Sequence, residues 1–491
     1  MNDQAFLLGI DCGQTALKIC VFDQNGNEIT SASSPTGACH SPDGLTAELD
    51  MEVLWSNVCT LLRKITAEID PKRIAAIGVS GHGNGVYAVD RDGRAFMKAI
   101  LSTDLRAGDV IDAWNADGSA EAIRDKILCP PWAGQPTPIL KHLKLHRPEL
   151  FDRIGAVLSC ADWLNLCLTG VLSCDYGSLG TSGLINQRTK ETDEALCLAY
   201  GLPELKSLIP PVYAAGSKIG TVCAATAEKT GLSTDTVVTV GNFDVNACCI
   251  GGGAVDQTRY AVTAGTWSIN AAFTDEPVIN ENLFSCNLYG DGKQYISIES
   301  SPTSAINLEV FLGEHPELTP KQCDALVRET EWKTALDALY LPYVKPLPTR
   351  PWLKGGFNQA AEGYELPEKL RILYEGVAMG HRYHMENLKK SGILRDTVRM
   401  TGGATRSNEW MQIFADVFGL PIELPNGHSA GALGAAICAG TAAGLYESIE
   451  QACAEMIKVR SIVKPDPERV AFYNVKFGGF LAAIDEQTPI K

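Results

Sequence analysis

Short apolar runs, separated by longer amphipathic stretches, dominate the start of the chain. Continuous apolar residues at 6–10, 19–22 and 74–80 predict buried strands, and apolar positions at the helical period over 51–69 predict a helix between the second and third of them. Strands that alternate with helices in this way are typical of an α/β fold.

The same order of elements starts again near Tyr260. The segment RYAVTAGTWSINAAF (259–273) predicts a strand, a Gly-Thr turn and a second strand. We therefore expect a chain that is duplicated in outline. The three glycines at 251–253 are the expected hinge or boundary, which divides the chain into residues 1–252 and 253–491.

Two further segments shape the second half. The Ala- and Gly-rich run 430–445 falls short of the roughly 18 to 20 strongly apolar residues that span a membrane, so we expect a buried helix whose end is interrupted by glycine. The proline-rich segment LPYVKPLPTRPW (341–352) predicts a long surface loop.

Composition narrows the class of protein. With 491 residues, of which 45% are hydrophobic, the chain has enough apolar surface for two or three domain cores. A net charge of −16 argues against broad binding to nucleic acid or to anionic membranes, because both would repel the protein. The first residues lack the features of a signal peptide, and the sixteen cysteines contain no CxxC pair, so we expect a cytoplasmic protein with reduced cysteines.

The polar segment between the first two predicted strands, DCGQTALK (11–18), has two interpretations: the polar tip of a hairpin, or a loop that binds phosphate. Gly13 allows close backbone approach, Gln14 and Thr15 offer hydrogen-bond donors, and Lys18 offers a cation. The segment AGTWS (264–268) repeats the Gly-Thr arrangement in the second half. Two such turns facing each other across a cleft would hold successive phosphates of a nucleotide through backbone N–H groups.

Two acids add candidate chemistry. Asp11 would repel a phosphate unless a divalent cation lay between them, so it indicates Mg²⁺, which prefers oxygen ligands; the alternative is that it caps its own turn. Asp244 lies in VVTVGNFDVNACCIGGG (237–253), where a strand gives way to a predicted helix, and such a position opens on a crevice in α/β folds. It is either a helix cap or a base that deprotonates a sugar hydroxyl as it attacks a γ-phosphate.

A third segment, TVRMTGGATRSNEWMQIFADVFGLPIEL (397–424), predicts a strand, a Gly-Gly turn and a helix. The paired glycines would let a flat group such as adenine lie against the backbone, or they simply form a tight turn. The expected apolar face of the helix consists of Trp410, Met411, Phe414, Val417 and Phe418.

Other catalytic motifs are absent or incomplete. The chain has no GxxxxGK[ST] phosphate loop, and GVSGH (78–82) has His82 where a nucleophile elbow needs glycine. The histidine pairs in HRYH (381–384) and HLKLH (142–146) have helical spacing but no carboxylate helper of the HExxH kind, so we do not expect either to bind a metal.

Taken together, these segments resemble the FGGY family of carbohydrate kinases over essentially the full chain. The most specific matches are IDCGQTALK (10–18), VSGHGNG (79–85), ILSTDLRA (100–107), GNFDVNA (241–247), AGTWS (264–268) and MTGGATRSNEWMQIFADVFGLPIELP (400–425). Within the family, ILSTDLRA, ESSPTSAINLEVF (299–311) and the Gly-Gly helix segment look most like the L-xylulose kinases.

The resemblance implies two ribonuclease H-like domains, of the actin and hexokinase type, around an interdomain cleft. The first domain would hold mainly the sugar and the second mainly ATP. By matched position, Asp244 would be the catalytic base and Asp11 would position Mg²⁺. The implied phosphate-binding residues are Gly13, Thr15, Lys18, Gly265 and Thr266, the adenine-binding residues are Gly402, Gly403 and Asn408, and the sugar-binding residues are His82, Asp104, Arg106 and Asp244. Arg106 could equally be the structural ion-pair partner of Asp104.

Some positions depart from the family pattern. Gln14 stands where many members have threonine, which leaves Thr15 as the hydroxyl of the first loop. Ser102, Thr103 and Asp104 replace the Trp-Asn-Asp of D-xylulose kinases. Because these latter changes lie on the expected sugar side, the resemblance implies a ketopentose such as L-xylulose rather than D-xylulose. D-ribulose, D-xylulose, or a polyol such as erythritol or glycerol, remains an alternative.

Two alternatives belong to other classes of protein. An actin-like ATPase needs neither the sugar-contact segments HGNG and STDLR nor Asp244, and a sugar sensor that has lost catalysis would not need both Asp11 and Asp244. We therefore expect an enzyme with ATP and Mg²⁺ as cofactors and a small sugar as substrate. We expect no nucleic-acid or membrane partner, and a homodimer is an open expectation because relatives commonly form one.

Overall fold

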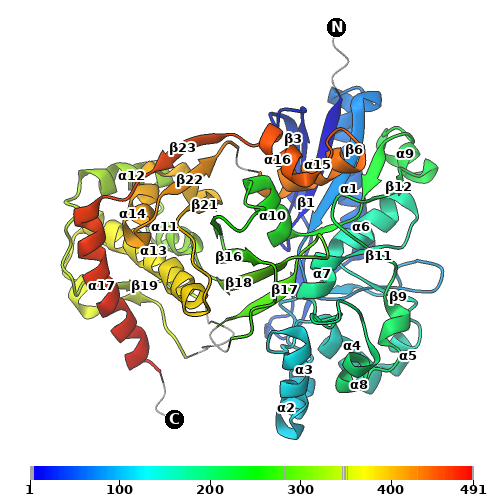
Figure 1. Ribbon diagram of the computed structural model, residues 1–491, viewed down its shortest axis with the longest axis horizontal. Coiled ribbons are helices and arrows are strands. Elements are labelled where there is room, and N and C mark those ends of the chain that lie inside the picture. The colour runs from blue at the N-terminus through cyan, green and yellow to red at the C-terminus, as the bar shows by residue number, and fades with distance from the viewer. Residues whose placement is uncertain are drawn as a thin grey trace.

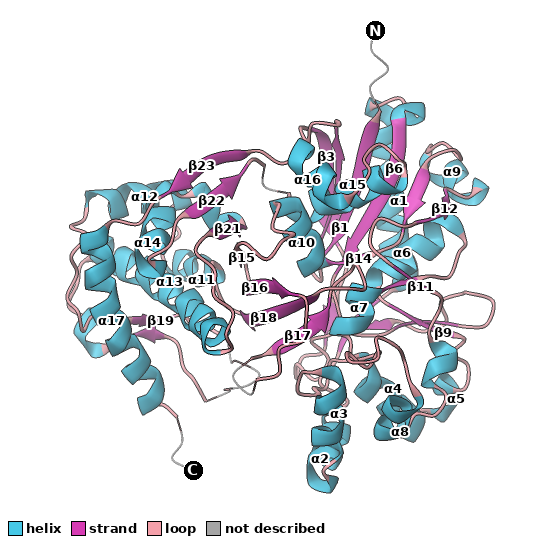
Figure 2. Ribbon diagram, viewed as in Figure 1, coloured by secondary structure: helices cyan, strands magenta, loops and turns pink. Residues whose placement is uncertain are grey.

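The computed structural model describes residues 5–280, 283–345, 347, 350, 352–427 and 429–488. Two seven-stranded mixed sheets form its framework, one in each half of the chain (Figures 1 and 2). The first contains, in spatial order, β12 (Lys218–Thr221), β13 (Val237–Thr239), β6 (Ile74–Gly81), β1 (Phe6–Cys12), β2 (Ala16–Phe22) and β3 (Glu28–Pro35), with β14 (Asn242–Phe243) also paired to β6. The second contains β17 (Ser285–Leu288), β18 (Tyr295–Ser301), β16 (Ser268–Thr274), β15 (Tyr260–Ala264), β21 (Val398–Thr401), β22 (Ile422–Pro425) and β23 (Val459–Val463).

Both sheets contain the same unit of three strands. β1 runs antiparallel to β2 and parallel to β6, while β15 runs antiparallel to β16 and parallel to β21. The register places Asp11 opposite Ser80 in the first sheet and Thr263 opposite Thr401 in the second. The duplication that the hydrophobic pattern predicts is therefore present in the strand pairing.

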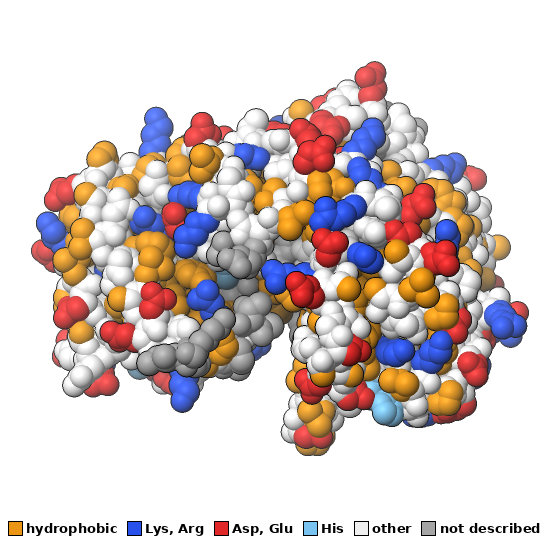
Figure 3. All heavy atoms as spheres, turned by 60° about the horizontal axis from the view of Figure 1, so that its bottom comes forward, with side chains coloured by type: hydrophobic (Ala, Val, Ile, Leu, Met, Phe, Trp, Pro, Cys, Tyr) orange, Lys and Arg blue, Asp and Glu red, His pale blue; other side chains and the backbone are white. Residues whose placement is uncertain are grey.

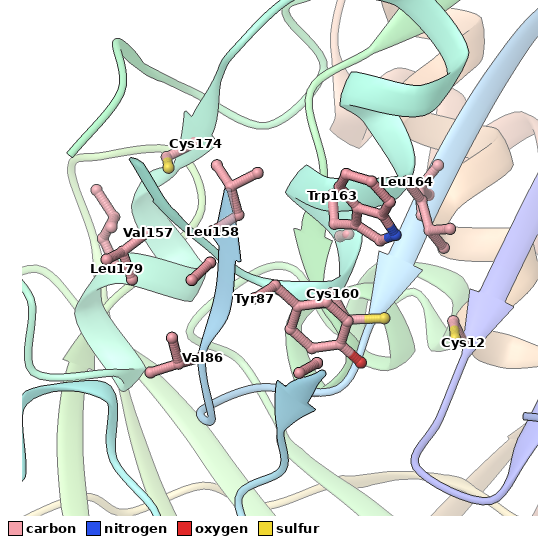
Figure 4. Packing of buried hydrophobic residues seen from close by; sticks show 14 of the residues in the cluster. Cys12, Val86, Tyr87, Val157, Leu158, Cys160, Trp163, Leu164, Cys174 and Leu179 are labelled. Atoms are coloured by element: carbon pink, nitrogen blue, oxygen red, sulfur yellow. The ribbon is translucent and has the colours of Figure 1, made fainter. Parts of the chain in front are cut away.

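Helices surround the two sheets and complete their cores. The first half contributes α1 (Met51–Glu68), α2 (Gly108–Asp117), α3 (Ser119–Ile127), α4 (Pro136–His146), α5 (Pro148–Phe151), α6 (Cys160–Thr169), α7 (Tyr176–Thr181), α8 (Glu194–Tyr200) and α9 (Ala224–Thr230). The second half contributes α11 (Ile306–Glu314), α12 (Pro320–Glu329), α13 (Leu366–Lys390), α14 (Asn408–Phe418), α16 (Ile449–Met456) and α17 (Pro467–Glu486). Figure 4 shows Tyr87, Cys160 and Trp163 together in the core of the first half. Among the residues that the structure describes, no helix has both the length and the apolar character of a membrane span.

The predicted helix and strand boundaries agree closely with the structure. The helix expected over 51–69 is α1, which begins after Asp50, whose side chain accepts hydrogen bonds from two N–H groups of the first turn. The expected apolar face of α14 is buried throughout. Local patterning therefore decides these elements.

Two helices that lie far apart in the sequence pack against each other between the sheets. They are α10 (Asp244–Gly252) and α15 (Ala430–Ala442), and α15 also lies directly on β1 and β6 (Figure 1). Glycine permits this approach, because a Cβ on Gly9 would lie 1.8 Å from the carbonyl oxygen of Ala432. The buried helix expected over 430–445 is confirmed, but it packs on the sheet of the other half.

One sequence expectation needs correction and another stays a prediction. Gly251 lies against Ala430 of α15, and Gly253, with φ of 72°, ends α10, so these glycines serve helix packing and helix termination. The hinge or boundary expected at 251–253 stays a prediction. The proline-rich segment is not an exposed loop, since Tyr343 and Leu347 are buried in the core of the second half. Apolar side chains between the prolines point inward there. Residues 346, 348, 349 and 351 of this segment lie outside the described residues.

The face shown in Figure 3 is hollowed between the two halves. Acidic and basic side chains are interspersed over this face rather than gathered by sign.

Candidate active site

The carboxyl ends of three parallel strands bring the two predicted acids together. β1 and β14 both run parallel to β6, and Ser80 of β6 pairs with Asp11 on one side and with Asn242 on the other. Asp244 follows β14 directly. The carboxyl edge of an α/β sheet is where ligands bind, so the strand order alone predicts a site here.

Asp11 is held by neighbours from three elements. Ser80 Oγ donates a hydrogen bond of 3.1 Å to Asp11 Oδ1. The first turn of α15 lies against the carboxylate, because a Cβ on Gly431 would be 2.4 Å from Asp11 Oδ2. Burial raises the pKa of Asp11, and the Ser80 hydrogen bond and the charge of Lys18 oppose that rise.

Asp244 is the first residue of α10. Its Oδ1 accepts a 2.7 Å hydrogen bond from the N–H of Val245, while the N-cap position belongs to Phe243, so Asp244 is not the residue that caps the helix. Burial and then the charge of Asp11 raise the pKa of Asp244 to about 7, although His82 opposes the shift. A carboxylate that exchanges its proton near neutral pH has the property that a general base needs.

The first predicted phosphate loop is the hairpin between β1 and β2. The Gly13 N–H donates to the Ala16 carbonyl oxygen at 3.0 Å, which closes the turn, and the Thr15 side chain is exposed. Gln14 Nε2 donates to Ser102 Oγ at 2.5 Å, and Thr103 Oγ1 donates to Gln14 Oε1 at 3.4 Å. The two departures from the family pattern, at 14 and at 102–103, therefore contact each other.

Lys18 points away from the tip of that hairpin. Its Nζ lies 3.6 Å from Glu28 Oε2 and also contacts Ser429 Oγ beside the first turn of α15. Ser429 Oγ in turn donates to Glu28 Oε2 at 2.9 Å. A role for Lys18 in binding phosphate would require it to exchange these partners, and that role stays a prediction.

The second predicted phosphate loop is the hairpin between β15 and β16. The Gly265 N–H donates to the Trp267 carbonyl oxygen at 3.2 Å, and the side chains of Thr266 and Trp267 are exposed. Backbone N–H groups of Ser304 and Ala305 donate to the carbonyl oxygens of Thr266 and Gly265, at 2.9 and 2.8 Å. The backbone of this turn is thus fixed while its hydroxyl side chain stays accessible.

The Gly-Gly turn lies next to the second hairpin. Gly402 has φ of 99°, and a Cβ there would lie 2.5 Å from the backbone carbonyl of Ala264, so only glycine fits. Gly403 faces open space, and Asn408 is exposed at the start of α14. A cavity of about 290 Å³ adjoins this turn. It is lined from both halves of the chain by residues that include Glu28, Gly402, Thr405, Asn426 and Ser429.

His82, one of the predicted sugar-contact residues, has a buried nitrogen without a hydrogen-bond partner in the described part of the chain. The side chain is 3% exposed, its Nε2 lies 2.9 Å from the Tyr87 hydroxyl, and its Nδ1 makes no hydrogen bond within the described part of the chain. Such an atom is costly to leave unpaired, so a substrate hydroxyl at this position would satisfy it.

Asp104 and Arg106 form an ion pair, which is the predicted alternative to sugar contact by Arg106. Asp104 is 0% exposed and accepts from Ala47 N–H at 2.7 Å and from Arg106 Nε and a terminal guanidinium N–H, both at 2.8 Å. Arg106 also donates to Glu48 at 2.8 Å. This bidentate pair holds the loop 102–106 in place, and direct sugar contact by either residue stays a prediction.

The two histidine pairs differ in their surroundings. His381 is buried among Ser268, Asn270 and Ser304, and burial lowers its pKa to about 3, so it is a neutral structural residue. His142 and His146 instead lie on the surface of α4, where Asp109 of α2 contacts both of them. The segment HLKLH (142–146) contains no carboxylate, and the sequence could not reveal Asp109 as its partner because Asp109 lies on another helix.

Comparison with known proteins identifies the class that this fold and site define. Residues 6–251 match the N-terminal domain, and residues 260–443 the C-terminal domain, of the FGGY family of carbohydrate kinases. The L-xylulose/3-keto-L-gulonate kinase of Escherichia coli (strain K12) is 31% identical over 98% of this chain and 99% of its own. The chain therefore belongs to the FGGY family of carbohydrate kinases, which phosphorylate their substrates with ATP.

Two further relatives agree in length and fold. A probable L-xylulose kinase of Pasteurella multocida (strain Pm70) is 31% identical over 96% of this chain and 97% of its own. The crystal structure of a ligand-bound xylulose kinase from Lactobacillus acidophilus superposes with a TM-score of 0.89 at 23% identity, over 98% of both chains. The expected architecture of two ribonuclease H-like halves is thereby confirmed.

Proposed function

We propose that this kinase phosphorylates the terminal hydroxyl of a ketopentose, and that L-xylulose is its substrate. Two relatives that bear L-xylulose kinase in their names match it over nearly the whole chain. The loop 102–106, where the sequence departs from D-xylulose kinases, lies beside the first hairpin and is fixed by the buried Asp104–Arg106 pair. A rigid loop at this place can select the arrangement of sugar hydroxyls.

Asp244 is the proposed catalytic base. Its carboxylate takes the proton from the sugar hydroxyl, the resulting oxygen forms a bond to the γ-phosphorus of ATP, and the bond from that phosphorus to the β,γ-bridging oxygen breaks to release ADP. The observation that carries this assignment is the position of Asp244 at the carboxyl edge of the first sheet, with its pKa raised to about 7. His82 Nδ1 and Asp244 would both face the sugar.

Asp11 is the proposed magnesium-positioning residue. The fit is chemically reasonable, because one carboxylate with one oxygen committed to Ser80 leaves acceptor capacity on the other, and Mg²⁺ takes few protein ligands besides phosphate oxygens and water. When bound, this ion would neutralise charge on the transferring phosphoryl group. The Asp11 side chain itself would set the distance between that ion and the first hairpin.

The second half, residues 253–491, is the proposed main binding region for the nucleotide. Gly13, Thr15, Gly265 and Thr266 would offer backbone and hydroxyl donors to the phosphates from two facing hairpins. Gly403 and Asn408, which are both exposed beside the Gly402 turn, would line the adenine. The helix α15 belongs to the second half of the chain but packs on the first sheet. It would therefore couple the two halves as they close.

A coupled ADP-release assay with Mg-ATP tests the substrate. The panel contains L-xylulose, D-xylulose, D-ribulose, erythritol and glycerol. We expect the highest kcat/KM for L-xylulose. A preference for another member would overturn the proposed sugar while leaving the kinase chemistry intact, and release of ADP at the same rate with and without every sugar would contradict the sugar-kinase chemistry itself.

A further inference from the structure

A cluster of three metal-ligating side chains lies on the surface of the first half, apart from the strand ends that form the candidate active site. Asp109 comes from the first turn of α2, and His142 and His146 come from α4. Their ligand atoms all lie within 4.8 Å of one another, and no other group of three His, Cys, Asp or Glu residues in the described part of the chain meets this criterion.

The two helices present the three side chains toward one point. His142 and His146 are four residues apart, so they lie on one face of α4, and their ring centroids are 4.5 Å apart. His142 Nδ1 is 3.1 Å from Asp109 Oδ1, and His146 Nε2 is 2.7 Å from Asp109 Oδ2. Ligand atoms around a tetrahedral Zn²⁺ lie roughly 3.3 to 3.5 Å apart. The three ligand atoms here lie within 4.8 Å of one another, so adjustment of the side chains would bring them to one ion.

Charge in the cluster suits a cation. The carboxylate of Asp109 lies against both imidazoles, so the cluster offers one acidic oxygen ligand beside two nitrogen ligands. Lys144, on the same helix, is engaged by Glu204 at 2.7 Å and therefore offers little repulsion to an ion bound at the cluster.

We propose that Asp109, His142 and His146 bind one divalent transition-metal ion of the zinc class, with water completing its coordination. Two imidazoles and one carboxylate favour Zn²⁺ over Mg²⁺, which prefers oxygen ligands, so this site and the proposed magnesium position differ in selectivity. The ion joins α4 to α2, the helix that begins immediately after the Asp104–Arg106 pair. The bound metal thereby stabilises the packing of these two helices against each other.

Titration of the metal-free full-length protein tests this site. Equilibrium dialysis with ZnCl₂ in the presence of excess Mg²⁺ should show one tightly bound Zn²⁺ per chain, with affinity reduced at least about 10-fold in His146→Ala and in Asp109→Asn. His315→Ala is the matched control, because His315 is a partly exposed histidine beside a single carboxylate, Glu317, at 3.4 Å. That variant should bind Zn²⁺ as the wild type does.

Co²⁺ absorption separates this site from binding by cysteine. We expect visible d–d bands without the near-ultraviolet charge-transfer band of a thiolate, and loss of these bands in His146→Ala. We also expect Zn²⁺ to raise the Tm of the wild type by a few degrees but not that of Asp109→Asn. The proposal is overturned if the wild type binds no Zn²⁺ above the level of His146→Ala, or if both variants keep the bound ion, since the histidines then only form ion pairs with Asp109.

Discussion

The same three-strand unit carries different chemistry at its carboxyl end in the two halves of the molecule. In the first sheet, Asp11 lies beside Ser80, and Asp244 follows the next parallel strand. In the second sheet, Thr263 and Thr401 share a 2.9 Å hydrogen bond, and Gly402 follows. A carboxylate suits the proton removal and the cation positioning that we propose for the first sheet, whereas hydroxyls and bare backbone suit the polyphosphate that we propose for the second. One folding unit used twice is thus adapted by a few residues at its strand ends.

Removal of the acid from the first strand end should give a large kinetic effect. We expect Asp11→Asn to lower kcat by about 10²-fold and to raise the Mg²⁺ concentration needed for half-maximal rate, because charge stabilisation by a bound cation is worth several kcal/mol. Steady-state rates across a Mg²⁺ series measure both quantities. Asp235→Asn, at an exposed position of the same half, is the control, and an unchanged Mg²⁺ dependence in Asp11→Asn would remove the metal-positioning role.

At the strand end of the second sheet, an added side chain should lower the stability of the protein. Gly402→Ala should lower the free energy of unfolding by about 2 kcal/mol or more, because its φ of 99° and the nearby Ala264 backbone leave no room for a Cβ. Gly403→Ala, where no atom lies within 4 Å of the added carbon, should unfold as the wild type does. Urea denaturation of the two variants makes the comparison, and equal loss of stability in both would contradict the packing described here.

The raised pKa of Asp244 predicts a pH dependence of activity. A base with its pKa raised to about 7 is protonated, and therefore inactive, below that pH, so kcat/KM should fall about tenfold per pH unit on the acid side and level off above it. Initial rates at limiting sugar and limiting ATP give kcat/KM, whose pH dependence reports the pKa values of the free enzyme. A profile that stays flat from pH 5.5 to 8 would show that Asp244 is not the titrating base.

Gln14 and Thr266, one in each hairpin, should affect different substrates, because the Gln14 side chain contacts the loop 102–106 on the expected sugar side. Gln14→Ala removes the contact with Ser102 and should raise KM for the sugar about 2- to 10-fold, the range that one hydrogen bond supports. Thr266→Ala should raise KM for ATP by a similar factor and leave KM for the sugar unchanged. Gln24→Ala, in the turn that follows β2, serves as the control. If Gln14→Ala raised KM for ATP and left KM for the sugar unchanged, the proposed sugar-side role of the Gln14–Ser102 contact would be wrong.

Part of this architecture follows from local sequence, and part depends on contacts between distant residues. The hydrophobic period predicts the central strands of both sheets, α1 and the buried helix α15. The turns after the strands single out Asp11 and Asp244 as candidate residues. The Gln14–Ser102 bond and the Asp109–histidine cluster join residues that no local pattern relates. Periodicity also cannot show that α15 packs on the sheet of the other half, because the glycines that permit this, Gly9 and Gly78, lie within apolar strand segments that do not indicate which helix covers them.

The central claim is that Asp244 of the first half is the catalytic base. Measuring both turnover and nucleotide affinity in Asp244→Asn tests it most directly. We predict that sugar-dependent ADP release falls by roughly 10² to 10⁴-fold, while the Kd for ADP measured by calorimetry stays within about threefold of the wild type. Asp235→Asn should match the wild type in both. If Asp244→Asn retained most of its turnover, or if it lost nucleotide affinity to the same degree as turnover, the assignment of the chemistry to the first sheet would be contradicted.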